Sequence, residues 1–522
     1  MLHYSLRKKG GVCAYASSPQ NKYAEKSNSS TATNKSNEQK LFDAAARGNL
    51  AEVKKLVAQG AIVNLAGDEG KTPLMAAVNG GHIGVAKFLV KSGAWINAQD
   101  HSGDNMLHRA SREGNLTAVK MLLELGADVN ASKTDGVTPL YIAGLNGHEK
   151  IVQLLISAGA HVNSVHRFGR STLNDVSEVG HEKIVQLLIS AGADVNNAGT
   201  KDGWTALHSA NLSGHEKIVR LLISAGADIN ASDTKGATTL HISTENGHEK
   251  IIQLLISAGA HVNASDMQGW TALHKACKAG HEKIVQLLIS TGADVDADTK
   301  YGWTALHSAS YYGHESIVRM LISAGANVNA IDYKGKTALY EASVKGHEKI
   351  VQLLISSGAD VNASDKNGWT VLHAISDEKI VQLLISSGAD VNASDKNGWT
   401  VLHSASLRGY DKTVQSLISA GAHINATNGF GTTALHNASK AGYDKIVQSL
   451  ISAGAHVNAN DMAGTTALHN ASKAGYDKIV QLLISAGAHV NASDDKGRTP
   501  LSYARRKNHQ KIIDLLLRAG AR

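Results

Sequence analysis

The sequence predicts an all-α protein in which short helix pairs stack in a row as a solenoid, with a turn-rich finger between successive pairs. The first observation is a glycine that returns about every 33 residues along most of the chain. Its positions are Gly70, Gly103, Gly136, Gly169, Gly203, Gly236, Gly269, Gly302, Gly335, Gly368, Gly398, Gly431, Gly464 and Gly497. A fixed period of about 20 to 50 residues indicates a stacked repeat architecture. The other two observations, a recurrent proline site and an apolar face with helical spacing, predict two helices in each unit.

The first helix of each unit is predicted to begin directly after a threonine. Thr205 precedes an apolar stretch and belongs to a residue type that commonly caps helix N-termini. Three of the four prolines in the chain directly follow the equivalent threonine, and proline is tolerated at the first helical residue. These prolines are Pro73, Pro139 and Pro500. The first helix is therefore expected to end near Gly214, about nine residues after its cap.

The second helix is predicted to begin near His215 and Glu216, where the acidic side chain is favourable against the helix dipole. Four apolar residues then follow on one helical face. They are Ile218, Val219, Leu222 and Ile223. Gly226 is suited to a left-handed helix end, and the following residues 227–236 are rich in Asn, Asp and Gly, as in a β-turn finger. Helices this short are unstable alone in water, so each unit must cover the next.

The ends of the array differ from its interior. Residues 1–37 are polar, basic and poor in apolar side chains, which predicts a disordered tail. A targeting segment within this tail is the alternative, because residues 1–24 lack acidic side chains. We expect the array to occupy residues 38–522, with an N-terminal cap at 38–67 and a C-terminal cap at 497–522. The C-terminal cap has Ser502 where histidine is usual, and it adds Arg505, Arg506 and Lys507.

Two units depart from the common length and pattern. The unit from Gly169 has Asn174 and Val176 where histidine and alanine are usual, and it is one residue longer. We expect it to be locally weak or bulged. The unit from Gly368 is three residues short, and the missing residues would have completed its first helix and glycine turn. A tolerated stacking defect is the favoured interpretation of the short unit, and a functional hinge is the alternative.

The repeated motif resembles that of the ankyrin repeat family. In this chain it reads G-x-T-[PA]-L-H-x-A…G-H-x-x-I-V-x-L-L-I-x-x-G-A-[DH]-V-N-A. The resemblance covers essentially all of residues 38–522, with about 14 to 15 tandem copies. It implies an elongated α-solenoid with projecting β-turn fingers. It also implies a non-enzymatic scaffold that binds other proteins along the concave face made by the fingers and the first helices.

Five tryptophans occupy the position directly after the periodic glycine, where other units have Lys, Asp, Val, Arg, Ala or Thr. They are Trp204, Trp270, Trp303, Trp369 and Trp399. Variation at a fixed position predicts exposure to solvent. Two interpretations stay open: the rings shield adjacent fingers, or they form a row of binding anchors, since Trp, Tyr and Arg dominate interface energetics.

The strongest candidate binding patch lies in two adjacent units. It combines Trp270, Lys275, Lys278, Trp303, Tyr311 and Tyr312 on one predicted face. Lys440 and Lys473 are predicted to continue a basic column further along the array. The alternative is that these lysines are simply solvated residues on a helix surface.

The sequence offers no catalytic, metal or cofactor site. Most of the 26 histidines are periodic, and periodicity together with the resemblance implies hydrogen bonding between turns and helices. The segment HEKIV lacks the second histidine of a metalloprotease motif, since Val219 and Val285 stand in its place. No unit adds a Ser, His and Asp combination that the others lack. We therefore predict no enzyme, no cofactor and no small-molecule substrate.

The net charge of +7 is concentrated at the two ends of the chain. Residues 1–40 and 494–522 each carry +5, which leaves about −3 for the body (7 − 5 − 5). The charge distribution thus does not favour nucleic acid as a partner, although binding of nucleic acid or an anionic membrane through the basic ends is the alternative function. With two cysteines and no apolar run of membrane-spanning length, we expect a monomeric cytoplasmic protein, with the nucleus or an organelle as alternatives.

Overall fold

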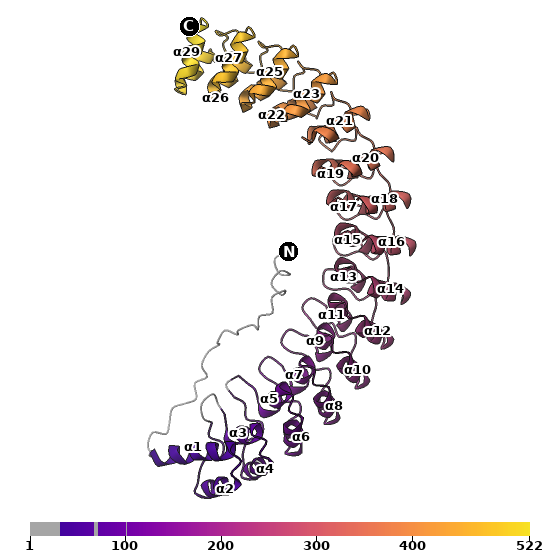
Figure 1. Cartoon of the computed structure of the whole chain (residues 1–522), viewed down its shortest axis with the longest axis vertical. Coiled ribbons are helices and arrows are strands. Elements are labelled where there is room, and N and C mark those ends of the chain that lie inside the picture. Colours follow the sequence, from indigo (N-terminus) through magenta and orange to yellow (C-terminus); the bar gives the residue numbers. More distant parts are fainter. Residues whose placement is uncertain (1–31, 67–70, 101) are drawn as a thin grey trace. The chain divides into compact units, whose positions relative to one another are not determined.

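The computed structural model describes residues 32–66, 71–100 and 102–522, with side chains from Asn37 onward. Most of the predicted tail, residues 1–31, lies outside the described residues. The chain divides into two compact units, residues 1–161 and residues 162–522. The described residues form α-helices joined by turns, with isolated bridges but no strand among them, so the all-α prediction is confirmed (Figure 1).

The helices of the first unit form four consecutive pairs. They are α1 (Ala32–Ala46), α2 (Leu50–Ala58), α3 (Pro73–Asn79), α4 (Ile83–Lys91), α5 (Met106–Glu113), α6 (Leu116–Glu124), α7 (Pro139–Leu145) and α8 (Glu149–Ser157). Helix α1 begins at Ala32, whereas the sequence placed the start of the array at residue 38. The segment before residue 38 is polar and lacks a capping pattern, so nothing in its composition indicated an extended first helix.

The second unit continues the same pairing. Its helices are α9 (Thr172–Val179), α10 (Glu182–Ser190), α11 (Ala206–Ser213), α12 (Glu216–Ser224), α13 (Thr239–Asn246), α14 (Glu249–Ser257), α15 (Ala272–Ala279), α16 (Glu282–Ser290), α17 (Ala305–Tyr312), α18 (Glu315–Ser323), α19 (Ala338–Lys345), α20 (Glu348–Ser356), the 3₁₀ helix η2 (Val371–His373), α21 (Glu378–Ser386), α22 (Val401–Arg408), α23 (Asp411–Ser419), α24 (Ala434–Ala441), α25 (Asp444–Ser452), α26 (Ala467–Ala474), α27 (Asp477–Ser485), α28 (Pro500–Arg506) and α29 (Gln510–Arg518). First helices pack on first helices, and second helices on second helices, so each compact unit has two layers.

The helix boundaries follow from the capping chemistry that the sequence predicted. Thr205 caps α11, and its hydroxyl accepts a hydrogen bond from the backbone of His208. Gly214 ends α11 with a φ of +76°, a left-handed conformation in which glycine is favoured. In α12, Ile218, Val219 and Leu222 are buried as predicted. Ile223 is only half-buried, because it lies at the edge of the buried face.

The fingers are joined to one another by backbone hydrogen bonds. In each case an N–H near the finger tip donates to a carbonyl of the preceding finger, as Met267 does to Lys235 at 2.8 Å. Nine such bonds run through the second unit. Their donor and acceptor pairs are Thr234–Asp202, Met267–Lys235, Lys300–Gln268, Tyr333–Tyr301, Lys366–Lys334, Lys396–Asn367, Gly429–Asn397, Met462–Phe430 and Asp495–Ala463. The fingers are therefore held in register with one another.

The asparagine of the recurrent V-N-A turn forms a second bridge between units. Asn263 donates from Nδ2 to the carbonyl of Gly292 at 3.0 Å. Its Oδ1 accepts from the N–H of Asp294 at 2.8 Å. The same two bonds recur at most units of the array, for example at Asn329 with Gly358 and Asp360. This repeated asparagine thus has a structural role in stacking.

The short unit keeps its finger but loses most of its first helix. Residues 371–373 form a single 3₁₀ turn, and Asp377 caps α21 in place of the usual glycine and histidine. The finger bond from Lys396 to Asn367 persists across this unit. The missing residues therefore remove the end of one helix without shifting the register of the fingers. A hinge at this point stays a prediction.

The unit from Gly169, which we expected to be locally weak or bulged, keeps the full eight residues of its helix α9. Asn174 replaces the usual histidine and donates from Nδ2 to the carbonyl of Trp204 at 2.9 Å. The added residue is accommodated in the following finger, where Thr200 accepts from the N–H of Trp204. The irregularity is thus confined to a finger, since an amide can make the bond that the imidazole makes elsewhere.

Candidate functional site

The buried histidines connect neighbouring units. The Nδ1 atom of His274 accepts from the backbone N–H of Thr271 at 3.2 Å. Its Nε2 donates to the carbonyl of Trp303, in the next finger, at 2.9 Å. Burial lowers the pKa of His274, so the ring is neutral with its proton on Nε2. Because both ring nitrogens form hydrogen bonds within the array, His274 and the equivalent buried histidines stabilise the stacking of neighbouring units.

The five tryptophans that directly follow the periodic glycines are half-buried. This corrects the expectation that their side chains are exposed to solvent. Each indole lies beside the histidine of its own unit, with ring centroids between 5.4 Å and 6.1 Å apart. The backbone N–H of Trp270 also donates to the finger carboxylate of Asp266 at 2.9 Å. Each ring therefore packs in part on its own unit and stays partly exposed. The packing agrees with the shielding interpretation, and a role as binding anchors stays a prediction.

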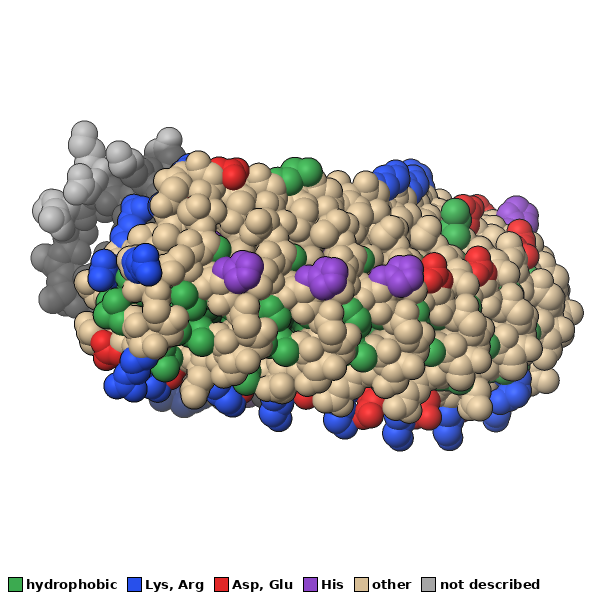
Figure 2. All heavy atoms as spheres, turned by 90° about the horizontal axis from the view of Figure 1, so that it is seen from above, with side chains coloured by type: hydrophobic (Ala, Val, Ile, Leu, Met, Phe, Trp, Pro, Cys, Tyr) green, Lys and Arg blue, Asp and Glu red, His purple; other side chains and the backbone are tan. Residues whose placement is uncertain are grey.

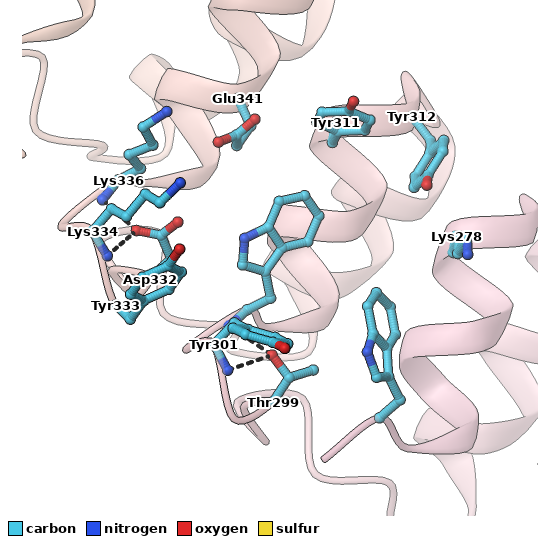
Figure 3. Close-up of a pocket in the computed structure, with 12 residues that line it drawn as sticks. Lys278, Thr299, Tyr301, Tyr311, Tyr312, Asp332, Tyr333, Lys334, Lys336 and Glu341 are labelled. Atoms are coloured by element: carbon cyan, nitrogen blue, oxygen red, sulfur yellow. Dashed lines mark hydrogen bonds between the residues drawn. The ribbon is translucent and has the colours of Figure 1, made fainter. Parts of the chain in front are cut away.

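Five of the six residues in the predicted patch line one hollow of about 490 Å³ on the second unit. They are Trp270, Lys278, Trp303, Tyr311 and Tyr312. The rest of the lining is Thr299, Tyr301, Asp332, Tyr333, Lys334, Lys336 and Glu341 (Figure 3). We call this the aromatic hollow. It is built from the fingers and first helices of consecutive units, the surface that we call the finger face.

Aromatic contacts organise the aromatic hollow. The rings of Trp303 and Tyr311 are 5.6 Å apart, and those of Tyr311 and Tyr312 are 5.0 Å apart. Lys278 places its Nζ 5.7 Å from the centre of the Trp270 ring. Tyr311 is further contacted by Lys345, whose Nζ lies 4.1 Å from the ring centre. These cation–π contacts hold aromatic side chains in fixed positions on a partly exposed surface.

Lys275 is the residue of the predicted patch that does not line the hollow. Its Nζ lies 3.7 Å from a carboxylate oxygen of Asp266 and 3.8 Å from one of Glu245. The same Nζ is 5.7 Å from the Trp270 ring centre. Lys275 therefore supports the base of the finger that carries Trp270.

A family model for ankyrin repeats matches the chain repeatedly. The matched segments are residues 41–133, 96–166, 140–233, 173–266, 240–332, 291–365, 339–428, 374–461 and 435–522. The chain belongs to the ankyrin repeat family. A search of curated proteins found no match. Ankyrin repeats are generally protein–protein interaction modules, and ankyrin repeat proteins are typically non-enzymatic binding scaffolds.

Several residues on the ankyrin fingers were missed by sequence reasoning. Tyr301 and Tyr333 are half-exposed at neighbouring finger tips, with ring centroids 5.9 Å apart. Other finger tips also expose large apolar side chains. These are Phe168, Met267, Phe430 and Met462. The sequence contains a signal for these finger-tip residues: each is an apolar residue one or two positions before the periodic glycine, in a turn that is otherwise polar.

Glu341 was also missed, and it is the most unusual side chain of the aromatic hollow. It lies on α19, at a position that varies among the ankyrin units and is occupied by Asp175 in one and Lys275 in another, and it is only 8% exposed. Burial raises the pKa of its carboxyl, and the neighbouring Lys336, Lys345 and Lys334 oppose that rise. The carboxylate forms no hydrogen bond or ion pair within the part of the chain that the structure describes.

The remaining candidates are distributed along the ankyrin array. Trp399 and Lys440 line a second hollow of about 290 Å³. Trp369 donates from Nε1 to Asp395 at 3.0 Å and lies under the guanidinium of Arg408, 5.2 Å away. Lys473 contacts the ring of Tyr503 at 5.7 Å. Trp204 packs beside His208. These residues are therefore not part of the aromatic hollow, and the basic column of Lys440 and Lys473 stays a prediction.

Five of the second ankyrin helices are linked to the preceding unit by ion pairs. A lysine of one unit pairs with an acidic residue of the preceding unit, as Lys412 does with Glu378 at 2.7 Å. The other such pairs are Lys217–Glu182, Lys379–Glu348, Lys478–Asp444 and Lys511–Asp477. Figure 2 shows basic and acidic side chains interspersed along one edge of the visible face. In the described residues, no helix has the length and apolar character needed to cross a membrane.

Proposed function

We propose that this ankyrin repeat protein is a non-enzymatic scaffold that binds partner proteins along its finger face, with the aromatic hollow as its main contact. The observation that carries the proposal is the convergence of partly exposed Trp and Tyr rings from consecutive units on one hollow. Tryptophan and tyrosine dominate binding hot spots because they bury large areas with few rotatable bonds. The lysines at the rim supply polar contacts around this centre.

The alternative partners, nucleic acid and anionic membranes, are less well supported. Five lysines of the second helices pair with carboxylates of the preceding units, and these pairs interrupt the positive charge along that surface. At the C-terminal end, the guanidinium of Arg498 pairs with Asp494, whereas Arg505, Arg506 and Lys507 are exposed and keep the alternative open at that end. Binding that depended on phosphate neutralisation would need uncompensated cations along the surface.

We also propose that the protein is monomeric and cytoplasmic. Cys277 is fully buried, and burial raises the pKa of its thiol, which disfavours the reactive thiolate. A buried, unreactive cysteine is compatible with a reducing compartment.

The proposed function can be tested by capture of partners from a cell lysate with the full chain. One variant replaces Trp270, Trp303, Tyr311 and Tyr312 with alanine. The control variant replaces Ile83 and Leu517, which are 43% and 46% exposed and lie on the second helices α4 and α29, with alanine. We expect the wild-type and control chains to retain the same proteins at about 0.5 M salt, where surface charge is strongly screened.

The four-fold variant should lose these proteins, because the loss of several anchors weakens binding by more than tenfold. Equal capture by the four-fold variant would remove the aromatic hollow from the proposal. Capture that disappears with rising salt, or that recovers nucleic acid, would favour the alternative function.

A further inference from the structure

The carboxylate of Glu341 is nearly buried and has no partner within the described residues. Figure 3 shows it at the edge of the aromatic hollow, between Lys336 and Tyr311. Buried polar groups in folded proteins almost always have a hydrogen-bond partner, because an unpaired buried charge is costly. A carboxylate that is unpaired and lines an open hollow is therefore suited to a donor supplied by a ligand.

The neighbouring lysines of the array are engaged with aromatic rings. The Nζ of Lys336 lies 4.3 Å from the ring centre of Tyr340, and that of Lys345 lies 4.1 Å from Tyr311. Lys334 similarly lies 5.3 Å from the ring centre of Tyr333. None of the three amines comes within ion-pair distance of Glu341. The acceptor positions of this carboxylate thus remain open toward the hollow.

The aromatic surroundings favour a planar cation as the ligand group. The hollow is lined by the rings of Trp270, Trp303, Tyr301 and Tyr333 in addition to Glu341. A guanidinium group stacks on aromatic faces and can donate two parallel hydrogen bonds to one carboxylate. It is also less strongly hydrated than an ammonium group, so it loses less on entering a half-buried site. Arginine therefore fits this combination better than lysine.

The rim of the hollow has the opposite charge. Lys278 lies on one side, and Lys334 and Lys336 lie on the other (Figure 3). The Asp332 carboxylate accepts from the backbone N–H groups of Lys334 and Lys336 at 2.8 Å each, so it is already used within its finger. A negative centre between positive edges complements a ligand with a positive centre and negative flanks.

We propose that the aromatic hollow binds an arginine side chain of a partner protein segment in which acidic residues flank that arginine. The guanidinium lies among the Trp and Tyr rings and donates to Glu341. The flanking carboxylates lie against Lys278 on one side and against Lys334 and Lys336 on the other. This inference rests on the proposed function, because it names the chemistry of the partner segment that the finger face binds.

The test uses a random linear peptide library displayed on phage, selected against the full chain. Three forms of the chain are compared: wild type, Glu341→Gln and Glu348→Gln. Glu348 lies on α20, pairs with Lys379 and does not line the hollow, so Glu348→Gln removes one negative charge from the same repeat elsewhere. A fourth selection uses the four-fold aromatic variant.

We expect the wild-type and Glu348→Gln chains to select peptides with an arginine between acidic residues, and the other two forms to lose that selection. For a selected peptide labelled with fluorescein, anisotropy should give a dissociation constant about tenfold weaker with Glu341→Gln, the loss typical of a charge-assisted hydrogen bond. Replacing the peptide arginine with glutamine should weaken binding to wild type by a similar factor. Replacing it with lysine should restore only part of the affinity.

The outcomes separate this inference from the proposed function. Peptides that require the four aromatic residues but show no enrichment of arginine would overturn the inference and leave the proposed function standing. Unchanged affinity in Glu341→Gln would do the same. Failure of the wild-type chain to select any peptide that depends on the aromatic residues would overturn both.

Discussion

At the scale of single residues, stacking depends on side chains that form hydrogen bonds on both sides of a unit boundary. His274 receives a bond from its own threonine cap and donates to the next finger. Asn174 replaces the same histidine in another unit and still reaches the next finger through Nδ2. A short amide with a donor of the right reach therefore serves at this position, although other units have Met75 or Tyr340 there. A titratable ring is not essential to it.

The titration of these histidines makes stability depend on pH. Burial lowers the pKa of nine of them in the folded protein below the ordinary value of 6.5. They are His108, His208, His241, His274, His307, His373, His403, His436 and His469. Below that value the unfolded chain binds more protons than the folded chain, so the free energy of unfolding falls as pH falls.

We predict that the urea midpoint decreases between about pH 7.5 and about pH 5.5. In His274→Asn, which introduces the residue naturally present at Asn174, the decrease should be smaller, by as much as about 1.4 kcal/mol of unfolding free energy per pH unit. Urea unfolding followed by circular dichroism at several pH values measures this slope. An unchanged slope in His274→Asn would show that this histidine does not titrate differently on folding.

At the scale of elements, the short unit shows how far a repeat can be reduced. Its first helix is a single 3₁₀ turn, yet the helices on both sides still contact it. The second-helix layer also continues, because α20 contacts α21 and α21 contacts α23. The loss is the end of one first helix, where neighbouring units have a glycine that ends the helix in a left-handed conformation.

We predict that restoring this element stabilises the protein. Inserting Leu-Arg-Gly after Ser376, copied from residues 407–409, should complete the first helix and its glycine turn. The added helical turn would cover apolar surface on α19 and α22, worth about 1 to 3 kcal/mol. Thermal unfolding should shift upward, and hydrogen exchange of residues 371–376 should slow. A lower midpoint after the insertion would mean that the shortened form is the better packed one.

At the scale of the whole molecule, the array has mainly nearest-neighbour contacts. Within the second unit, first helices contact the preceding and following first helices, and second helices do the same. In a chain of this kind no single hydrophobic core is shared by all the units. The free energy of unfolding is therefore close to a sum of contributions from the units and from the interfaces between them. An internal unit can then be removed if the interfaces at the junction are reproduced.

We predict that deletion of residues 443–475 leaves a folded protein. The junction joins Gly442 to Tyr476, which restores the natural Gly-Tyr-Asp-Lys sequence of both neighbouring units. Circular dichroism per residue should be unchanged. Deletion of residues 499–522 should instead cause aggregation, visible by size-exclusion chromatography, because it uncovers the faces of α26 and α27 on which α28 and α29 pack. If the protein that lacks residues 443–475 were globally unfolded, the description of stability as a sum over units and interfaces would be wrong.

Much of the fold was predictable because its rules are local and repeated. Proline after threonine placed the helix starts, and the periodic glycines placed the turns, since both act through backbone geometry. The regular helix α9 was not foreseen, because the ability of Asn174 to replace histidine depends on its distance to the next finger. The tryptophans were expected to be exposed, but they pack beside histidines of their own units.

By itself the sequence determined the repeat, the helix pairs and the set of aromatic and basic residues on the finger face, because these follow from spacing and local conformational preference. Only the tertiary structure decided that Trp270, Trp303, Tyr311 and Tyr312 share one hollow, that Lys275 is excluded from it, and that Glu341 lines it unpaired. The physical reason is that a hollow formed between consecutive units depends on how side chains of neighbouring repeats approach one another, which no single repeat encodes.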